Sequence, residues 1–267
     1  QRTQDEILRK AGNESVQIFG NKNEDFLEAV KLLIERGFDH IDINLGCPVK
    51  KIIRAGKGSA LLLESDFVKE LLLKLKKEFG NDIKLSMKIR TGYKNFSDPE
   101  YYVRLAEEYE LFQICIHGRT QEQLYSGQAD WNIIKKMKHK YKNVRIIGNG
   151  DATDLKAIKE KTDSAKPDGI MKARGLLGNP WLLKEAKDYF KTGVFHESEV
   201  GIEEIKNTLI KHINYCIEDK GEIRANLDMR KHIFWYLKEF ENIEKIKKDI
   251  IKIESIKDVL KYIVNNV

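Results

Sequence analysis

Residues 40–61 read HIDINLGCPVKKIIRAGKGSAL, a run in which a short strand pattern gives way to a glycine-rich loop. Ile41 and Ile43 alternate with polar side chains, which is the period of a β-strand with two different faces. Asn44 and Cys47 stand at or just after the end of this strand, and Cys47 lies between a glycine and a proline. A cysteine that only fills a core needs no such setting. The stretch therefore indicates a strand that carries chemistry at its carboxyl end.

Five further runs have the composition of short strands, and helical patterns separate them. The candidate strands are residues 15–19, 40–44, 83–89, 112–117, 144–149 and 168–172. The helical segments between them keep their apolar residues on one face and carry cap residues or glycines at their ends. Strands that alternate with helices predict a parallel sheet with right-handed crossovers.

Two architectures fit six parallel strands: an open doubly wound sheet, or a TIM-type (β/α)8 barrel of which six strands are visible. The strand ends favour the barrel, because strand after strand finishes at a polar group, as the converging loops of a barrel active site require. These groups are Gln17, Asn44 with Cys47, Lys88 with Arg90, His117 with Arg119, Asn149 with Asp151, and Arg174. The sequence therefore predicts an α/β fold, an N-terminally incomplete TIM-type (β/α)8 barrel.

The pattern changes near residue 199, where strand signals stop. Three helical runs follow, over residues 202–218, 225–239 and 243–263, and residues 191–198 before them have the composition of a linker. We therefore expect two domains, a barrel-type domain over residues 1–190 and an all-helical domain over residues 199–267.

Composition limits the class of protein. No apolar run approaches the roughly 18 residues that a membrane span needs, and the first ten residues lack the apolar stretch of a signal peptide, so we expect a cytoplasmic protein without a membrane partner. Three cysteines without a CxxC pair argue against both a disulfide framework and a zinc site. The net charge of +6 and the pI near 8.9 allow a polyanionic partner but do not by themselves indicate one.

Glycines follow the last two candidate strands, in residues 146–153 (IIGNGDAT) and 173–180 (ARGLLGNP). Backbone N–H groups of glycines can approach an anion closely, and the loops after the last two strands are the usual phosphate site of TIM-type barrels. The pair of loops therefore predicts a phosphorylated cofactor.

Several motifs together resemble the tRNA-dihydrouridine synthases. They are DINLGCPVKKIIRAGKGSAL (42–61), MKIRTG (87–92), IHGRTQEQLYSGQADW (116–131), IGNGDAT (147–153), ARGLLGNPW (173–181) and MRKHIFWYL (229–237). The resemblance covers essentially the whole chain. It implies an FMN-containing TIM barrel followed by a helical tRNA-binding domain, which reduces the C5–C6 double bond of particular uridines in tRNA with NADPH as the electron source. It also implies two strands ahead of the first one visible here, so the 1–190 domain is expected to lack the first two strands of the barrel.

The same resemblance assigns roles to the residues at the strand ends. Cys47 matches the general acid that protonates C5 of the uracil after a hydride has reached C6, and a thiol with an ordinary pKa of about 8.5 carries the proton this needs at neutral pH. Lys88 would offset the negative charge of the reduced flavin, and Gln17 and Asn44 would bond to the flavin or the base. The other expected cofactor-binding residues are His117, Arg119, Asn149, Gly150, Asp151, Arg174 and Gly175. No metal is expected.

Two basic clusters are expected to contact RNA. Lys50, Lys51, Arg54 and Lys57 follow Cys47, and Arg230, Lys231 and His232 lie on a helix of the tail. Neutralising phosphates needs such clusters, and a uracil must leave its stack to reach a flavin in a barrel mouth. The plainer interpretation of the tail cluster is a solvated helix face whose Trp235 and Tyr236 belong to a helical core.

Two alternatives to a tRNA-dihydrouridine synthase stay open at this level. One is a flavin-deficient RNA-binding relative, and the other is a flavin-dependent barrel reductase of free pyrimidines. Residue 173 is alanine where the resembling family usually has glycine, and the strand expected beneath the flavin is absent, so we expect weak FMN binding by this chain alone. The flavin content of the purified protein distinguishes a flavin enzyme from the first alternative. The basic tail argues against the second.

Overall fold

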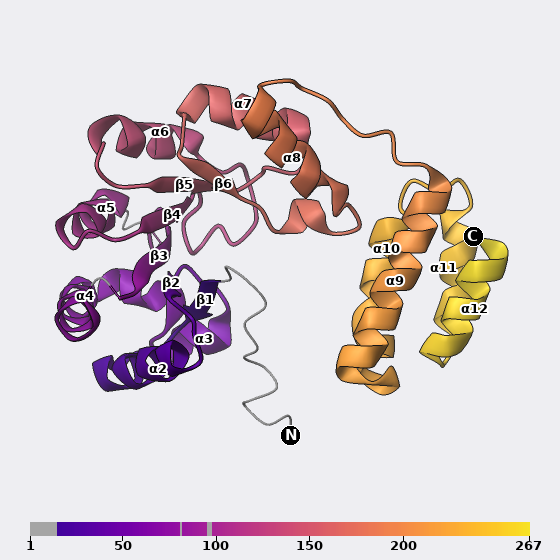
Figure 1. The fold of residues 1–267 in the computed structure, drawn as a ribbon, viewed down its shortest axis with the longest axis horizontal. Helices are drawn as coiled ribbons and strands as arrows, with labels where there is room; N and C mark the ends of the chain where they lie inside the picture. The colour runs from indigo at the N-terminus through magenta and orange to yellow at the C-terminus, as the bar shows by residue number, and fades with distance from the viewer. Residues whose placement is uncertain (1–14, 81, 95–97) are drawn as a thin grey trace. The chain divides into compact units, whose positions relative to one another are not determined.

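The computed structural model describes residues 15–80, 82–94 and 98–267. Its contacts divide the chain into two compact units, each described by itself below (Figure 1). The sheet unit comprises the described residues up to Ala152 together with Lys156–Lys172, and the helical unit comprises Thr153–Leu155 together with Ala173–Val267.

Six parallel strands form the sheet, and their order in the sheet is their order in the sequence. They are β1 (Ser15–Ile18), β2 (His40–Leu45), β3 (Lys84–Arg90), β4 (Gln113–His117), β5 (Ile146–Asn149) and β6 (Gly169–Met171). A doubly wound sheet would reverse its strand order in the middle, and this sheet does not. The predicted α/β fold of incomplete barrel type is therefore confirmed, and β1 and β6 form the two edges within the described residues.

Helices follow the strands and cover the outer side of the curved sheet in Figure 1. They are α2 (Asn23–Glu35), α4 (Ser65–Phe79), α5 (Pro99–Glu108), α6 (Trp131–Lys140) and α7 (Leu155–Ala165). The short helix α3 (Lys50–Arg54) and the 3-10 helix η1 (Gly58–Leu63) belong to the connection between β2 and α4. Ile41 and Ile43 of β2 and Leu71 of α4 belong to one apolar core and are fully buried. Burial of each such side chain contributes about 1.5–3 kcal/mol, so the outward strand residues hold the sheet to its helices.

The opposite faces of the strands carry polar groups, because side chains alternate along a strand. Register places Asn44 beside Lys88 and Lys88 beside Cys115 across three neighbouring strands. One step further along, Arg90 pairs with His117 and His117 with Asn149. The predicted polar strand ends therefore lie in adjacent rows on one side of the sheet.

The helical unit contains a short 3-10 helix and five α-helices in its described residues. They are η2 (Arg174–Leu176), α8 (Trp181–Thr192), α9 (Ile202–Lys220), α10 (Glu222–Tyr236), α11 (Ile243–Lys252) and α12 (Ile256–Asn266). Its apolar core includes Leu209, Ile233 and Val259, which are fully buried, and is separate from the core of the sheet unit.

Two details differ from the sequence-based expectation. The boundary between the two units falls before residue 173 rather than near residue 190. The reason is that Trp181 of α8 donates a hydrogen bond to Glu204 of α9 and packs edge-on against Tyr236. The predicted third helical run, 243–263, is two helices, because the side chain of Ser255 caps α12 by accepting a hydrogen bond from the N–H of Asp258.

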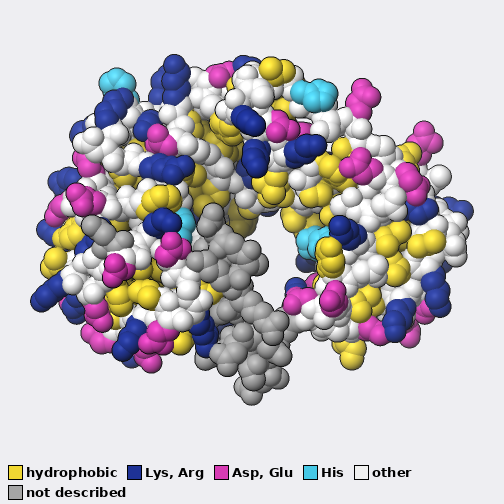
Figure 2. Space-filling view, in the orientation of Figure 1, with side chains coloured by type: hydrophobic (Ala, Val, Ile, Leu, Met, Phe, Trp, Pro, Cys, Tyr) yellow, Lys and Arg dark blue, Asp and Glu magenta, His cyan; other side chains and the backbone are white. Residues whose placement is uncertain are grey.

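No helix in the described part of the chain is both long and apolar enough to span a membrane. On the face seen in Figure 2, Lys and Arg side chains are interspersed with Asp and Glu, so the net positive charge does not form one uniform basic surface there. Partner binding must therefore be argued from local clusters.

Candidate active site

Cys47 lies in the loop after β2, and hydrogen bonds hold that loop on both sides of the cysteine. The side-chain oxygen of Asn44 accepts hydrogen bonds from the N–H groups of Gly46 and Cys47, at 3.1 and 2.9 Å. The carbonyl of Cys47 accepts from both the N–H and the hydroxyl of Ser59, at 3.1 and 2.8 Å. Gly58 has φ +62°, and a Cβ there would lie 2.9 Å from the Cβ of Cys47, so only glycine fits. The thiol is half-buried on a backbone that is held in place.

A buried carboxylate, that of Asp42, stabilises this loop through hydrogen bonds to side chains of β1 and β3. Asp42 is 6% exposed, and its two oxygens accept hydrogen bonds from the amide of Gln17 and the hydroxyl of Ser86, both at 2.6 Å. Since Asp42 fixes which end of the Gln17 amide donates, the Gln17 oxygen is turned towards Asn44 and accepts its N–H at 2.6 Å. A continuous chain of hydrogen bonds thus runs from Asp42 through Gln17 and Asn44 to the backbone of Cys47.

Lys88 lies in the middle of the polar face, between Asn44 and Cys115 in register. Its side chain is half-buried, and no hydrogen bond or ion pair joins its ammonium to another of the described residues. A half-buried cation without an anionic partner favours binding of an anion or of a group that becomes anionic during a reaction. The site therefore has the charge that a reduced flavin ring would need.

The other cysteine of the sheet unit, Cys115, has a different environment. Burial raises the pKa of Cys115 to about 12, and its sulfur lies 3.6 Å from the sulfur of Met171. A fully buried thiol among strand side chains behaves as a small apolar group. Cys47 is therefore the thiol of this face that lies in a loop and is partly open to a ligand.

His117 ends β4 and is 6% exposed. Burial, and then the positive charges of Arg90, Lys88 and Arg119, lower the pKa of His117 to about 3. Its Nε2 lies 3.4 Å from a guanidinium nitrogen of Arg119, which can only donate, so Nε2 is the unprotonated nitrogen. The ring is neutral at physiological pH and presents its other N–H as a donor.

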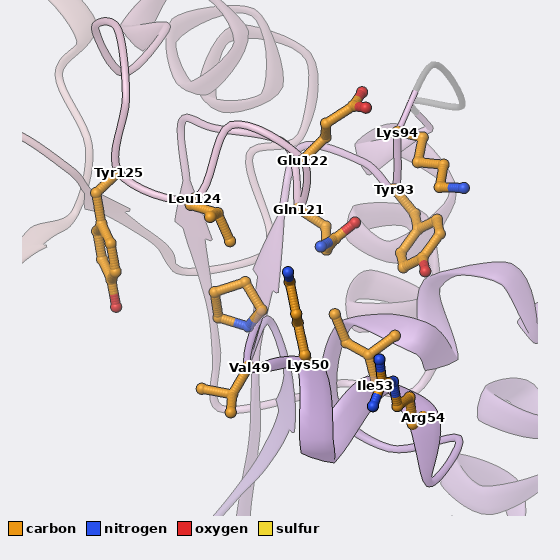
Figure 3. A pocket seen from close by; sticks show the side chains of 11 residues that line it. Val49, Lys50, Ile53, Arg54, Tyr93, Lys94, Gln121, Glu122, Leu124 and Tyr125 are labelled. Carbon is orange, nitrogen blue, oxygen red and sulfur yellow. The ribbon is translucent and has the colours of Figure 1, made fainter.

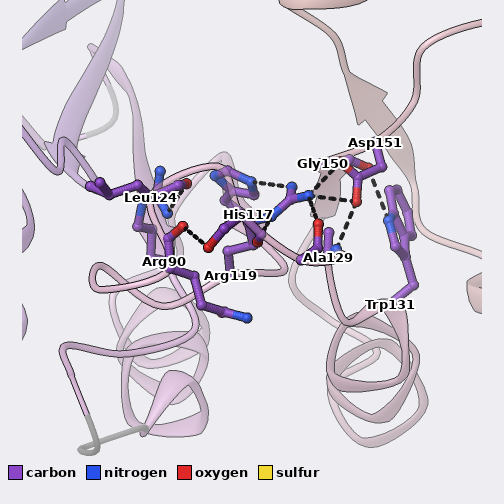
Figure 4. A network of polar contacts seen from close by, with 11 residues as sticks. Arg90, His117, Arg119, Leu124, Ala129, Trp131, Gly150 and Asp151 are labelled. Carbon is purple, nitrogen blue, oxygen red and sulfur yellow. Dashed lines mark hydrogen bonds and ion pairs between the residues drawn. The ribbon is translucent and has the colours of Figure 1, made fainter.

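Arg119 is 2% exposed and is held by its own loop and by the loop after β5 (Figure 4). Its guanidinium donates to the carbonyls of Ser126 and Gly127 and to both carboxylate oxygens of Asp151, at 2.7 and 2.9 Å. Burial alone would raise the pKa of Asp151, but the N–H of Ala129 and the charge of Arg119 outweigh it, so the pKa lies below its usual value. The pair joins the loops after β4 and β5. A direct contact of either residue with a phosphate stays a prediction.

Gly148 in β5 and Gly150 after it pack closely against neighbouring segments. A Cβ on Gly148 would lie 2.4 Å from the ring of Trp131, and the indole N–H of Trp131 donates to the carbonyl of Gly150 at 3.0 Å. Gly150 has φ +116°, and a Cβ there would lie 3.0 Å from the ring of His117. The amide of Asn149 donates to the carbonyl of Met171 on β6. The two glycines therefore set the path of the loop next to His117.

The sequence profile of the dihydrouridine synthase family matches residues 2–266, nearly the whole chain. The chain belongs to the dihydrouridine synthase family. Two curated relatives are the tRNA-dihydrouridine synthase B of Escherichia coli (strain K12), 32% identical over 254 residues, and that of Klebsiella pneumoniae, 33% identical over 248 residues. These matches cover 95% and 91% of this chain and 78% and 75% of the relatives. Among solved structures, the DHODH of Eimeria tenella in complex with ferulenol is similar with a TM-score of 0.46 and 16% identity, over 69% of this chain and 57% of that one.

In this dihydrouridine synthase the basic residues after Cys47 lie on and beside the short helix α3. Lys50, Lys51 and Arg54 are exposed, and Lys57 is half-buried with its ammonium 6.0 Å from the centre of the Phe19 ring. The structure thus brings the first predicted RNA cluster to the surface next to the candidate acid. Contact with RNA itself stays a prediction.

The remaining predicted site residues belong to the helical unit. Arg174 is exposed and Gly175 half-buried, both in η2. Arg230 donates to the carbonyls of Ile250 and Ile253, at 3.2 and 2.6 Å, and so binds the end of α11. For Arg230 the structure therefore shows a structural contact.

Lys231 and His232, next to Arg230 on α10, have different surroundings. Lys231 is exposed. Burial lowers the pKa of His232, whose ring packs edge-on against His212 and Trp235. Of the tail cluster, Lys231 is the residue that the structure presents as a surface cation.

Several residues of the site were not predicted from the sequence. Asp42 and Ser86 form the hydrogen bonds beneath the Cys47 loop, and Ser59 holds its carbonyl. The sequence carried a signal for two of them. Side chains two residues apart in a strand share a face, so Asp42 lies on the same face as Asn44, and Ser86 on the same face as Lys88. Ser59 carries no such signal, since it meets Cys47 through a turn of the loop.

Proposed function

We propose that this dihydrouridine synthase reduces the C5–C6 double bond of specific uridines in tRNA, with FMN as its cofactor and NADPH as its electron donor. The observation that carries the proposal is a half-buried thiol on a fixed loop at the carboxyl ends of parallel strands, next to a row of inward polar groups. Family membership and the names of the relatives support the substrate class.

The residues of the polar face fit an anionic, flat cofactor. Lys88 supplies a cation without an anionic partner among the described residues, and Gln17 and Asn44 supply amide groups oriented by Asp42. His117 supplies a neutral N–H donor, and Asn149 and Gly150 border it in the next loop. When bound, FMN would supply the hydride for C6 of the base, with NADPH as the source of the electrons.

The contribution of the protein is to hold the reacting groups and to move one proton. Delivery of a hydride to C6 leaves negative charge on C5 and the neighbouring carbonyl, and the S–H of Cys47 donates its proton to C5. The C5–H bond forms as the S–H bond breaks, and the resulting thiolate takes a proton from solvent. Lys88 stabilises negative charge at the cofactor, and removal of such a preorganised charge typically lowers a rate by about 10²–10³.

The test is the variant Cys47→Ala, assayed with added FMN and NADPH on unmodified tRNA transcripts. Because only the proton donor is lost, dihydrouridine formation should fall by about 10²–10⁴, while NADPH oxidation and flavin binding stay close to those of the unaltered protein. Cys216→Ala, a change at a buried thiol of the helical unit, is the control and should keep activity.

Three other results would contradict the proposed function or the proposed role of Cys47. Loss of flavin binding in Cys47→Ala would make Cys47 a packing residue. RNA binding without any flavin binding by the unaltered chain would favour a flavin-deficient RNA-binding relative. Reduction of free uridine with no activity on tRNA would favour a reductase of free pyrimidines.

A further inference from the structure

A pocket of about 540 Å³ opens beside the Cys47 loop, within the sheet unit (Figure 3). Its walls come from the segment after Cys47 with α3, from the turn after β3, and from the loop after β4. The lining residues are Pro48, Val49, Lys50, Ile53, Arg54, Tyr93, Lys94, Gln121, Glu122, Leu124 and Tyr125. The volume lies within the usual range for sites that bind small molecules or single groups of a larger ligand. None of the roles assigned above uses this space as a whole.

The walls of the pocket are largely apolar and yet open to solvent. Leu124 is 44% exposed and Tyr125 57% exposed, and Val49 is 54% exposed. Ile53 and Tyr93 are half-buried on the other side. An exposed apolar patch of this kind, concave and next to a candidate acid, is characteristic of a binding surface.

Cations outnumber acids around this apolar surface. Among the described residues that line it, Lys50, Arg54 and Lys94 stand against a single carboxylate, that of Glu122. In Figure 3 the side chain of Lys50 rises from α3 into the space, towards Gln121. The combination of an apolar wall and a basic rim complements a ligand with a flat apolar face and a negative group.

The pocket is also preformed, because hydrogen bonds hold its walls in place. The buried guanidinium of Arg90 donates to the carbonyl of Gly46 at 2.9 Å, and to those of Thr120 and Leu124 at 2.8 and 2.9 Å. It therefore ties the Cys47 loop to the loop after β4, which form opposite walls. The same guanidinium lies 5.8 Å from the centre of the Tyr125 ring, within the range of a cation–π contact.

Two of the five non-glycine residues with positive φ in the described part of the chain line this pocket. Leu124 has φ +50° and Lys94 has φ +48°, in the left-handed region that side chains larger than asparagine rarely adopt. A bulky leucine in this conformation is held by the bond from Arg90 to its carbonyl. Strain of this kind persists where the surrounding structure fixes it, and it clusters at ligand sites.

We propose that this pocket binds the nucleotide adjacent to the target uridine in the RNA strand. Its base lies against the apolar wall of Leu124 and Tyr93, and its phosphate lies at Lys50 and Arg54. The proposal rests on the proposed function, because it takes RNA as the substrate of the Cys47 site. Extrusion of a base from its stack exposes the faces of its neighbours, and aromatic or apolar side chains are the groups that proteins place against such faces.

The position of the pocket supports a neighbour of the target rather than the target itself. Pro48 and Val49 line the pocket and directly follow Cys47 in the sequence, so the pocket lies next to the candidate acid. A strand that places one base at Cys47 therefore brings the next one to this wall. The pocket thereby adds affinity for single-stranded RNA without any contact to the reduced base.

The test compares fluorescently labelled, unmodified tRNA transcripts bound to the full chain and to two variants. Leu124→Asn removes the apolar contact but keeps the backbone conformation, because asparagine tolerates the left-handed region. Arg54→Ala removes the phosphate contact. Each variant should weaken tRNA binding by about tenfold, as expected for one stacked base or one phosphate contact. Flavin fluorescence on titration with FMN should stay unchanged in Leu124→Asn, because Leu124 has no assigned contact with the cofactor.

Matched controls lie on α4, away from the lining residues. Leu73→Asn changes another exposed leucine of the sheet unit, 54% exposed, and Lys77→Ala removes another exposed lysine. Both should bind tRNA like the unaltered protein. Thermal unfolding of all four variants shows whether each is folded.

The outcomes separate this inference from the proposed function. If Leu124→Asn binds tRNA as tightly as the unaltered chain, or if the unaltered chain binds no tRNA, the inference is wrong. A raised KM for NADPH with unchanged tRNA affinity would assign the pocket to the dinucleotide and would also overturn it. If tRNA binding depends on Leu124 and Arg54 but no dihydrouridine forms, the pocket binds a nucleotide of the RNA, and the proposed function is wrong.

Discussion

Asp42 shows how one buried carboxylate positions a reactive group that it does not touch. Its oxygens hold Gln17 and Ser86, and through Gln17 they set the amide of Asn44 that binds the backbone of Cys47. In Asp42→Ala two buried donors lose their acceptor, which costs about 1–3 kcal/mol of the free energy of unfolding. We also expect slower dihydrouridine formation, because the Gln17 amide can then turn. Urea unfolding and the tRNA assay measure the two effects.

Two comparison variants make this prediction specific. Asp42→Asn keeps an acceptor for Gln17, and the hydroxyl of Ser86 can turn to accept from the new amide, so most of the loss should be recovered. Asp39→Ala removes a surface carboxylate that pairs with Lys84 and should change stability by about 1 kcal/mol at most. Equal losses in Asp42→Ala and Asp42→Asn would rule out the orienting role.

His117 predicts a definite pH dependence of stability. Its pKa in the folded protein, about 3, lies below the ordinary value of 6.5, so the folded state resists protonation and the unfolded state accepts it. The stabilisation from the neutral ring is complete above the ordinary pKa of 6.5 and is lost as the pH falls towards 3. In His117→Gln, which does not titrate, the free energy of unfolding should fall less steeply between pH 7 and pH 4. Parallel slopes in the two proteins would contradict this.

At the scale of elements, alternation of side chains made much of the sheet unit predictable. The six strands lie where apolar residues recur at every second position, and each predicted boundary is within two residues of the observed one. The same alternation placed Asn44, Lys88 and His117 on one face. The partners of Arg119 and Asp151 were not predictable, because they depend on the path by which the loop after β4 returns to β5.

The break between α11 and α12 shows a different limit of sequence reasoning. Isoleucines continue at helical spacing through residues 243–263, so the local pattern predicts one helix. The structure ends α11 early, where carbonyls of Ile253 and Glu254 accept hydrogen bonds from side chains of α10. Those donors, Arg230 and Asn226, are more than 20 residues away in the sequence. The Ser255 cap of α12 lies within the local sequence, but these donors lie outside any local window.

Arg230 and Lys231 are neighbours on α10 and were predicted together to contact RNA, but they have different surroundings in the structure. Arg230→Ala should lower the free energy of unfolding of the helical unit by about 1–3 kcal/mol, because two carbonyls lose their donor. Lys231→Ala, at an exposed position, should change it by about 0.5 kcal/mol or less but weaken tRNA binding if this surface meets RNA. Chemical denaturation and tRNA titration of both variants provide the measurement. A stable Arg230→Ala protein with weakened tRNA binding would instead restore the predicted RNA contact.

For the whole molecule, the existence of two regions followed from the loss of strand signals, but their boundary did not. Trp181 and the rest of α8 have the composition of another barrel helix and form the first α-helix after the last strand. Only the contacts of Trp181 with Glu204 and Tyr236 show that α8 belongs with α9 and α10. Gly178 also lies so close to the backbone of Trp235 that a Cβ would come within 2.3 Å. Long-range contacts of this kind leave no local signature.

Because each unit has its own core, we expect the chain to unfold in two transitions rather than one. Leu71 is fully buried in the sheet unit, and Leu71→Ala should cost about 2–5 kcal/mol there. Val259 is fully buried in the helical unit, and Val259→Ala should destabilise that unit alone, by less because fewer methyl groups are removed. Differential scanning calorimetry should show each variant lowering a different transition. If either variant shifts both transitions equally, the two cores unfold as one cooperative unit and the division fails.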